Sequence, residues 1–321
     1  MKHVAFFFLF TVALLSKVFA LSLDVAPEVG FAKGESGEYV FYPDSSYSDD
    51  KLSELLWDYG FLYVGAKTGF RGERFSLENG VRFCVASEKD TMSDSDWQNV
   101  TGSALDAYQY KTNYSESDNI LCRSVSVSTK ASFTFRPLFW LNLAPFVAVD
   151  FDYMRFCAKD GWYEYGSEGK YYNYACDDKA HNSTGTFSGT VMRYKRWDVS
   201  NWLGLDATLL HPAGLRAIFS FAFTTFFFSA DVDDHVLRDT TFVDFATSAF
   251  CSYKTGVTTE CDLSERCTFG CSLFFTKSAI VRGFTYMRGE GEKFYALLSD
   301  SECGMSVSKL DISAFARIRV F

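Results

Sequence analysis

Two pairs of ionisable residues at two-residue spacing stand out in this chain. Asp94 and Asp96 form one pair, and Asp233 and His235 form the other. In an extended segment, residues two positions apart project from the same face, so each pair would present both of its side chains together. Either pair alone could also belong to a solvated acidic loop, and Asp94 with Asp96 could form a calcium site.

Asp233 and His235 have the chemistry of an oriented base. Asp233 can accept a hydrogen bond from one ring nitrogen of His235, which fixes the tautomer and leaves the other nitrogen to take a proton. Asp94 and Asp96 would repel each other when both are ionised, so one would hold its proton more tightly or the two would share a water. Both pairs are expected at the ends of strands.

The other histidines and the cysteines give no comparable site. His211 stands beside a proline in an expected short turn, and His181 lies in a polar loop. No CxxC or Cys/His spacing suggests zinc, so we expect no metal and no cofactor. The cysteines number nine, so at least one is free or pairs outside the chain. Cys84 and Cys122, on strands expected to flank Asp94, are candidates for a disulfide.

Composition excludes several classes of protein. The chain has 321 residues, with 31 Lys+Arg against 40 Asp+Glu, and this acidic balance makes nucleic acid an unlikely partner. A mean hydropathy of -0.04 rules out a polytopic helical membrane protein. The content of aromatic residues, 18%, rules out a disordered chain.

Residues 1–20 read as a secretory signal. Lys2 and His3 give the charged start, residues 4–15 the apolar run, and residues 18–20 a cleavage site of small residues. An uncleaved anchor helix is the alternative, but the apolar run is short for a membrane span. We therefore expect residues 21–321 to form a single domain in an export compartment.

Apolar residues alternate with small or polar ones in several segments, as strands with two different faces require. Clear examples cover residues 125–129, 147–153, 215–223, 267–275 and 312–320. Apolar faces about nine to eleven residues long suit tilted strands that cross a bilayer. A soluble β-sandwich would also alternate, but the polar face here is made of Ser, Thr, Asp, Arg and small residues, as a wet barrel interior requires.

The connections differ in length, as they do in outer-membrane barrels. Short turns are expected at residues 211–214 and 276–279, and long polar loops near 88–118, 158–190 and 229–262. Short turns face the periplasm in such barrels and long loops face the exterior. On this reading His211 faces the periplasm.

The chain resembles the omptin family of outer-membrane proteases, in order along almost all of the sequence that follows the expected signal. The specific motifs are Met92-Ser-Asp-Ser-Asp-Trp97, which is similar to the family's Asp-x-Asp-Trp loop, and Asp231-Val-Asp-Asp-His235, which is similar to its Asp-x-Asp-x-His loop. Weaker strand matches lie at residues 34–40, 51–57, 113–118, 193–205 and 275–279.

The resemblance implies a fold and a reaction. The fold would be all-β, a ten-stranded antiparallel transmembrane β-barrel with long extracellular loops, in the bacterial outer membrane and with its active site at the outer mouth. The reaction would be hydrolysis of peptide bonds at basic residues. Carried over by position, Asp94 and Asp96 form one catalytic couple, and Asp233 and His235 form the other, with the attacking water held between them.

Further implications concern what the protein binds. Glu38 and Asp231 match the family's substrate-binding acids, and Asp106 is our candidate for a third. Polypeptides with basic residues and outer-membrane lipids are the expected partners, and we expect a monomer. Family members need lipopolysaccharide, held by a Tyr-x-Glu-x-Arg pattern, which the comparable stretch at residues 149–153 lacks. Dependence on lipopolysaccharide is therefore left open.

Two other functions compete with the protease. The first is a catalytically inactive barrel that serves as an adhesin or a structural surface protein. The second is a simple pore, which the packed interior of a ten-stranded barrel disfavours. The presence of all four catalytic matches favours the enzyme.

Overall fold

The structure is a computed structural model that describes residues 22–42, 51–97, 111–166, 182–298 and 302–321. These residues form a single antiparallel sheet of 15 strands and one short 3-10 helix. The elements are β1 (Ser22–Phe41), β2 (Lys51–Arg71), β3 (Phe75–Ser87), β4 (Lys89–Asp96), β5 (Asn113–Phe133), β6 (Phe135–Leu138), β7 (Leu141–Tyr165), β8 (Ser183–Leu210), β9 (Leu215–His235), η1 (Val236–Arg238), β10 (Thr240–Ser248), β11 (Ser252–Asp262), β12 (Cys267–Ser278), β13 (Val281–Arg288), β14 (Ala296–Leu297) and β15 (Glu302–Arg319).

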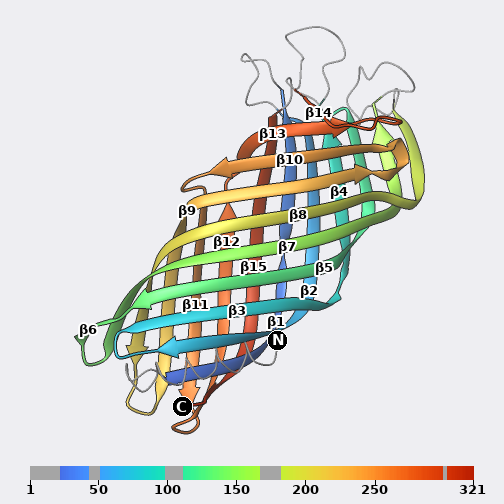
Figure 1. Ribbon diagram of the computed structural model, residues 1–321. Coiled ribbons are helices and arrows are strands. Elements are labelled where there is room, and N and C mark those ends of the chain that lie inside the picture. The colour runs from blue at the N-terminus through green and yellow to red at the C-terminus, as the bar shows by residue number, and fades with distance from the viewer. Residues whose placement is uncertain (1–21, 43–50, 98–110, 167–181, 299–301) are drawn as a thin grey trace, which may run out of the picture.

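The sheet closes on itself (Figure 1). Its pairings run from β11 through β12, β15, β1, β2, β3, β5, β7 and β8 to β9, and β9 pairs with β11 again. Three strands of the ring each pair, along one edge, with two shorter strands that follow each other in the chain. β3 and β4 both pair with β2, β10 and β11 both pair with β9, and β12 and β13 both pair with β15.

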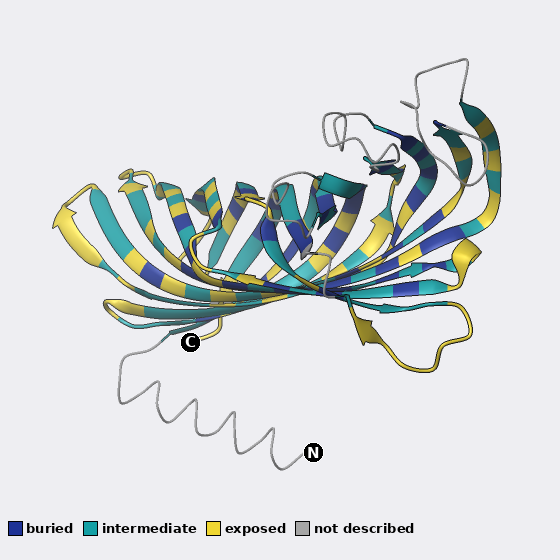
Figure 2. Cartoon of the chain, turned by 90° about the horizontal axis from the view of Figure 1, so that it is seen from above, coloured by how far each residue is buried: buried dark blue, intermediate teal, exposed yellow. Residues whose placement is uncertain are grey.

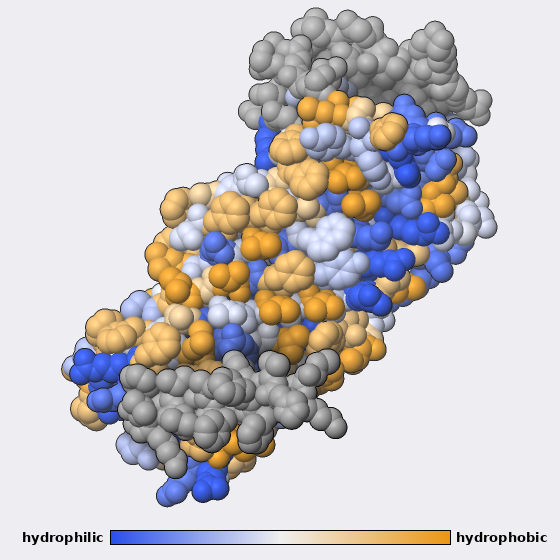
Figure 3. Space-filling model, viewed as in Figure 1, coloured by the Kyte–Doolittle hydropathy of each residue, from blue (hydrophilic) through white to orange (hydrophobic). Residues whose placement is uncertain are grey.

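The predicted alternation is confirmed. Residues expected to meet lipid are exposed on the outside, including Val147, Phe219 and Phe221, each more than half exposed. Ala222, which follows Phe221 and projects from the opposite face, is buried. Bands of exposed and less exposed residues alternate along the strands in Figure 2, and hydrophobic side chains cover much of the middle of the face in Figure 3. Of the described residues, none lies in a helix that is long and apolar enough to cross a membrane.

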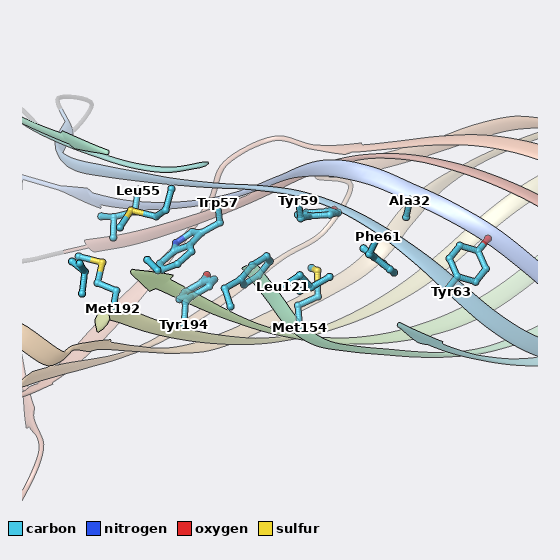
Figure 4. Close-up of a cluster of buried hydrophobic side chains, with 14 residues drawn as sticks. Ala32, Leu55, Trp57, Tyr59, Phe61, Tyr63, Leu121, Met154, Met192 and Tyr194 are labelled. Carbon is cyan, nitrogen blue, oxygen red and sulfur yellow. The ribbon is translucent and has the colours of Figure 1, made fainter. Parts of the chain in front are cut away.

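An aromatic cluster fills part of the interior (Figure 4). The rings of Trp57 and Tyr194 stack with centroids 5.0 Å apart, and Phe156 packs against both. Met92 joins this cluster from β4, two residues before Asp94. The cluster therefore fixes the strands that carry the candidate site.

Ion pairs fill another part of the interior. Arg82 bonds both Glu28 and Asp311, and Lys130 bonds Asp206. A cavity of about 190 Å³ remains among these and neighbouring charged residues. Because cations and acids are paired across the interior, the arrangement disfavours a wide pore.

The expected turn at residues 211–214 is confirmed, and Gly214 supplies its positive φ of 77°. The expected turn at residues 276–279 is wrong, because β12 and β13 continue in one direction along β15 with only a short interruption. Much of the three expected long loops is strand. The backbone N–H of Asp262 bonds the carbonyl of Gly214, so residues 229–262 do not all lie at one end.

The suggested disulfide between Cys84 and Cys122 is also wrong, since both thiols are free. Cys84 packs against the interior cluster, whereas Cys122 is exposed. A register shift in β5 between Leu121 and Arg123 turns Cys122 outward, although simple alternation from Ser124 would place it inside. The expected signal, residues 1–20, lies outside the described residues.

Candidate active site

Strand β4 presents Asp94 and Asp96 to the interior. Pairing with β2 places Asp94 opposite Leu55 and Asp96 opposite Ser53. The side-chain amide of Asn113 donates to Asp96 Oδ2 at 3.2 Å. Burial and the neighbouring Asp96 raise the pKa of Asp94 well above its ordinary value, and burial also raises the pKa of Asp96. The carboxyl pair therefore holds protons more tightly than free aspartate does.

Strand β9 presents Asp231, Asp233 and His235 to the interior, at the strand's last alternating positions. His235 Nε2 lies 2.5 Å from Asp233 Oδ2. The ring of His235 meets the ring of Phe242 edge-on, with centroids 5.3 Å apart. Asp233 is therefore in position to orient the imidazole, as the two-residue spacing predicted.

The two pairs act on each other across the interior. Strands β5, β7 and β8 separate β4 from β9 along one side of the ring. Nevertheless, the charge of Asp233 adds to the rise in the pKa of Asp94. His235 acts on Asp96 in the opposite direction and partly offsets the rise that burial causes in its pKa. The structure thus brings together the four residues that the sequence analysis selected.

Arg238 is a member of this group that sequence reasoning missed. It ends η1, the turn that follows His235, and its guanidinium contacts His235 Nδ1. Its positive charge opposes the effect of burial on Asp94 and Asp96, so the pKa of each carboxyl is raised less than it would be without Arg238. Both ring nitrogens of His235 therefore have partners, and Nδ1 can accept a proton from water only after Arg238 has moved off it.

Glu38 and Asp231, the predicted substrate-binding acids, do meet, and a third acid joins them. Asp244 on β10 lies directly opposite Asp231 on β9. One carboxylate oxygen from each of the three residues lies within 4.8 Å of the others. Burial raises the pKa of all three carboxyls, that of Asp244 to about 7. The chemistry of this acid cluster, defined as Glu38, Asp231 and Asp244, suits a small cation.

Tyr194 contacts both the acid cluster and the aromatic cluster. Its hydroxyl donates to Asp231 Oδ2 at 2.8 Å, and its ring stacks on Trp57. The fully buried Arg196 lies opposite Asp231 on β8 and bonds Asp198 at 2.9 Å. The hydrogen bond from Tyr194 therefore holds the carboxylate of Asp231 in place.

Of the remaining sequence candidates, two are not described by the structure and one lies away from the site. Asp106 and His181 lie outside the described residues. His211 is in the confirmed turn, where its Nδ1 accepts from the backbone of Ala213 at 3.2 Å, away from the strand ends that carry Asp94 and His235.

Comparison with known proteins agrees with the fold and identifies a family. The sequence matches the model of the Omptin family over residues 19–264. The outer membrane protease OmpT from Escherichia coli is similar in structure, with a TM-score of 0.79, 14% identity, and coverage of 93% of this chain and 96% of that chain. The outer membrane protein OprG from Pseudomonas aeruginosa is a remote match, with a TM-score of 0.33, 9% identity, and coverage of 92% and 95%. No curated protein matches the sequence.

The sheet is closed and antiparallel, with apolar side chains outside and polar ones inside. Buried acids and a histidine project into its interior. These features define an outer-membrane barrel protein with a candidate hydrolytic site. The chain belongs to the Omptin family. Family and fold together support an outer-membrane protease.

Proposed function

We propose that the protein is an outer-membrane endopeptidase that hydrolyses peptide bonds at basic residues. The observation that carries this proposal is that the strands of both couples meet in one interior cluster, because Leu55, opposite Asp94, and Met192, opposite His235, both belong to it. A water between the two couples would attack the scissile carbonyl carbon.

The proposed reaction needs no covalent intermediate. Asp233 holds His235 at Nε2. Once Arg238 leaves Nδ1, that nitrogen takes a proton from the attacking water while the new C–O bond forms. The same proton then passes to the leaving amine as the C–N bond breaks. Asp94 and Asp96 position the water and stabilise the charge that develops.

The proposed topology is a ten-stranded transmembrane barrel whose active-site end faces the cell exterior. The closed ring of pairings passes through ten strands, which supports the count. The turns at residues 72–74, 211–214 and 263–266 share the end opposite Asp94 and His235. Short turns at one end are typical of the periplasmic side.

Glu38 and Asp231 are the proposed binding groups for the basic side chain. Glu38→Gln should lower kcat/KM for a peptide with one Lys or Arg by about 10- to 100-fold, because it removes a charge-assisted hydrogen bond. A matched peptide with norleucine in place of the basic residue should be cut poorly by both proteins. Fluorogenic peptides and refolded protein provide the measurement.

Glu35→Gln is the matched control for this change. Glu35 lies on β1 with Glu38, but its charged neighbours are Asp58, Glu54 and Lys277 and not the acid cluster. It should leave the ratio of rates on the two peptides unchanged. Equal cleavage of basic and neutral peptides by the unaltered protein would contradict this assignment.

Outer-membrane lipids are the proposed second partner. Arg123, Arg155 and Lys195 stand directly opposite one another on β5, β7 and β8. Arg123 and Arg155 are exposed on the outer surface, and the apolar Phe151 lies four residues before Arg155. Like charges placed opposite each other repel, and an anionic headgroup between them would relieve the repulsion.

Arg155→Ala should therefore weaken binding to vesicles that contain an anionic lipid and leave binding to zwitterionic vesicles unchanged. Co-sedimentation of the folded protein with the two kinds of vesicle measures the difference. Lys89→Ala, which removes an exposed cation paired with Asp118 at 2.6 Å, is the control. The same loss in both variants would contradict a specific role for the row of three cations.

The competing functions are less well supported. An inactive adhesin has no need for four site residues that act on one another in the interior. A pore conflicts with the ion pairs and aromatic rings that fill the interior. The cleavage assay with basic and neutral peptides separates the protease from both.

A further inference from the structure

We propose that Asp244 makes the acid cluster select lysine over arginine in the substrate. This inference rests on the proposed cleavage at basic residues and deepens it. Asp244 becomes a third specificity-determining residue beside Glu38 and Asp231. The size of the cluster, its unsatisfied carboxylate oxygens and the different shapes of the two basic side chains support this inference.

The size of the cluster matches an ammonium group. Three oxygens that lie no more than 4.8 Å apart fit within a circle of radius about 2.8 Å. A nitrogen on the axis of this circle can therefore lie about 2.7–2.9 Å from all three oxygens, the distance expected of a charge-assisted hydrogen bond. A lysine ammonium has three N–H donors, one for each carboxylate.

A guanidinium matches the same cluster less well. Its five N–H donors spread over a planar fork, and it binds carboxylates best in pairs of parallel bonds. Three acceptors as close together as these can be reached only from one edge of that plane. One of the three carboxylates would then lack a donor, so arginine should gain less from Asp244 than lysine does.

The carboxylates of the cluster are also buried and incompletely satisfied, and Arg196, opposite Asp231, pairs with Asp198 instead. Glu38, Asp231 and Asp244 are 3%, 0% and 1% exposed. Each has one buried carboxylate oxygen without a hydrogen-bond partner. Across the described residues, no ion pair involves any of the three. Since buried charges without partners are unfavourable, a cation brought by the substrate would meet three carboxylates that each have an unsatisfied oxygen.

Strand pairing explains why Asp244 can act with the other two. It lies directly across from Asp231, with β10 held between β9 and β13. Thr285 lies opposite Asp244 on β13 and is itself buried. The carboxylate is therefore fixed by two neighbouring strands and not carried on a loop.

The test compares two peptides that differ only in Lys or Arg at the cleaved position. The unaltered protein should favour the Lys peptide in kcat/KM by about 10-fold, the effect of one charge-assisted hydrogen bond. Asp244→Ser should lower kcat/KM for the Lys peptide by about 10- to 100-fold, with a smaller loss for the Arg peptide. Retained cleavage of the Arg peptide shows that the variant is folded.

Asp234→Asn is the matched control. Asp234 also lies on β9, but it faces Arg193 at 3.4 Å and not the acid cluster. The Lys-to-Arg ratio should be unchanged in this variant. Binding of both peptides to a His235→Ala protein, measured by fluorescence anisotropy, gives the same comparison without turnover and should show the same preference.

Three results would overturn the inference. Equal use of Lys and Arg peptides, unaffected by Asp244→Ser, would remove Asp244 from specificity and leave the proposed function intact. Failure of the protein to cleave or bind either basic peptide would end both. Competitive inhibition by Ca²⁺ that disappears in Asp244→Ser, without any Lys preference, would assign the cluster to a metal ion instead.

Discussion

Replacing His235 with alanine is expected to lower kcat by about 10²- to 10⁴-fold, the usual contribution of a general base. His235 is the only described histidine at the strand ends that carry the acids, and Asp233 already orients its ring at 2.5 Å. The variant should still bind the peptide, because the acid cluster does not depend on the imidazole. Initial rates at saturating peptide, with refolded protein of known concentration, provide the measurement.

His211→Ala is the control for this prediction. It removes the same side chain from an exposed turn at the opposite end of the sheet. It should leave kcat within about twofold of the unaltered protein, as expected of a surface substitution. Loss of activity in His211→Ala together with retention in His235→Ala would refute the proposed base.

Asp94→Ala is expected to lower kcat by about 10²- to 10³-fold, comparable to the loss of one preorganised stabilising group in other hydrolytic sites. The carboxyl is buried, one of its oxygens has no hydrogen-bond partner, and its pKa is raised by burial and by Asp96. The unpaired oxygen of this carboxyl is therefore available to hold the attacking water by a hydrogen bond. The sheet should stay folded, because strand pairing holds β4 in place.

The control for Asp94 is Asp118→Ala on the neighbouring strand β5. The side chain of Asp118 is about half exposed and pairs with Lys89 at 2.6 Å. Its loss should change kcat little, although the same charge is removed from an adjacent strand. If the two variants lose activity equally, the effect of Asp94→Ala would be one of overall charge and not of position.

The sequence was sufficient to predict features that depend on local periodicity. Alternation alone placed Phe219 and Phe221 on the outside. Two-residue spacing alone placed Asp94 with Asp96, and Asp233 with His235, on common faces. In both cases the side-chain period of a strand determines the result, and no knowledge of pairing is needed.

Features that depend on pairing between distant strands were missed. Asp244 joins the acid cluster because β10 pairs with β9, in a region expected to be a loop. Cys122 faces outward because a single register shift reverses the alternation in β5. The short 3-10 helix η1 places Arg238 so that its guanidinium contacts His235. Composition and residue spacing do not predict these features, because strand pairing and backbone geometry determine them.

The central claim is that two residue couples activate a water against a peptide bond at a basic residue. The most direct test incubates one peptide that contains a single lysine and a single arginine with the unaltered protein and with His235→Ala, and maps the products by mass spectrometry. We predict cuts only beside these two residues, faster beside lysine, and almost none with His235→Ala. Cuts at unrelated bonds, or the same products at the same rate from both proteins, would contradict the account.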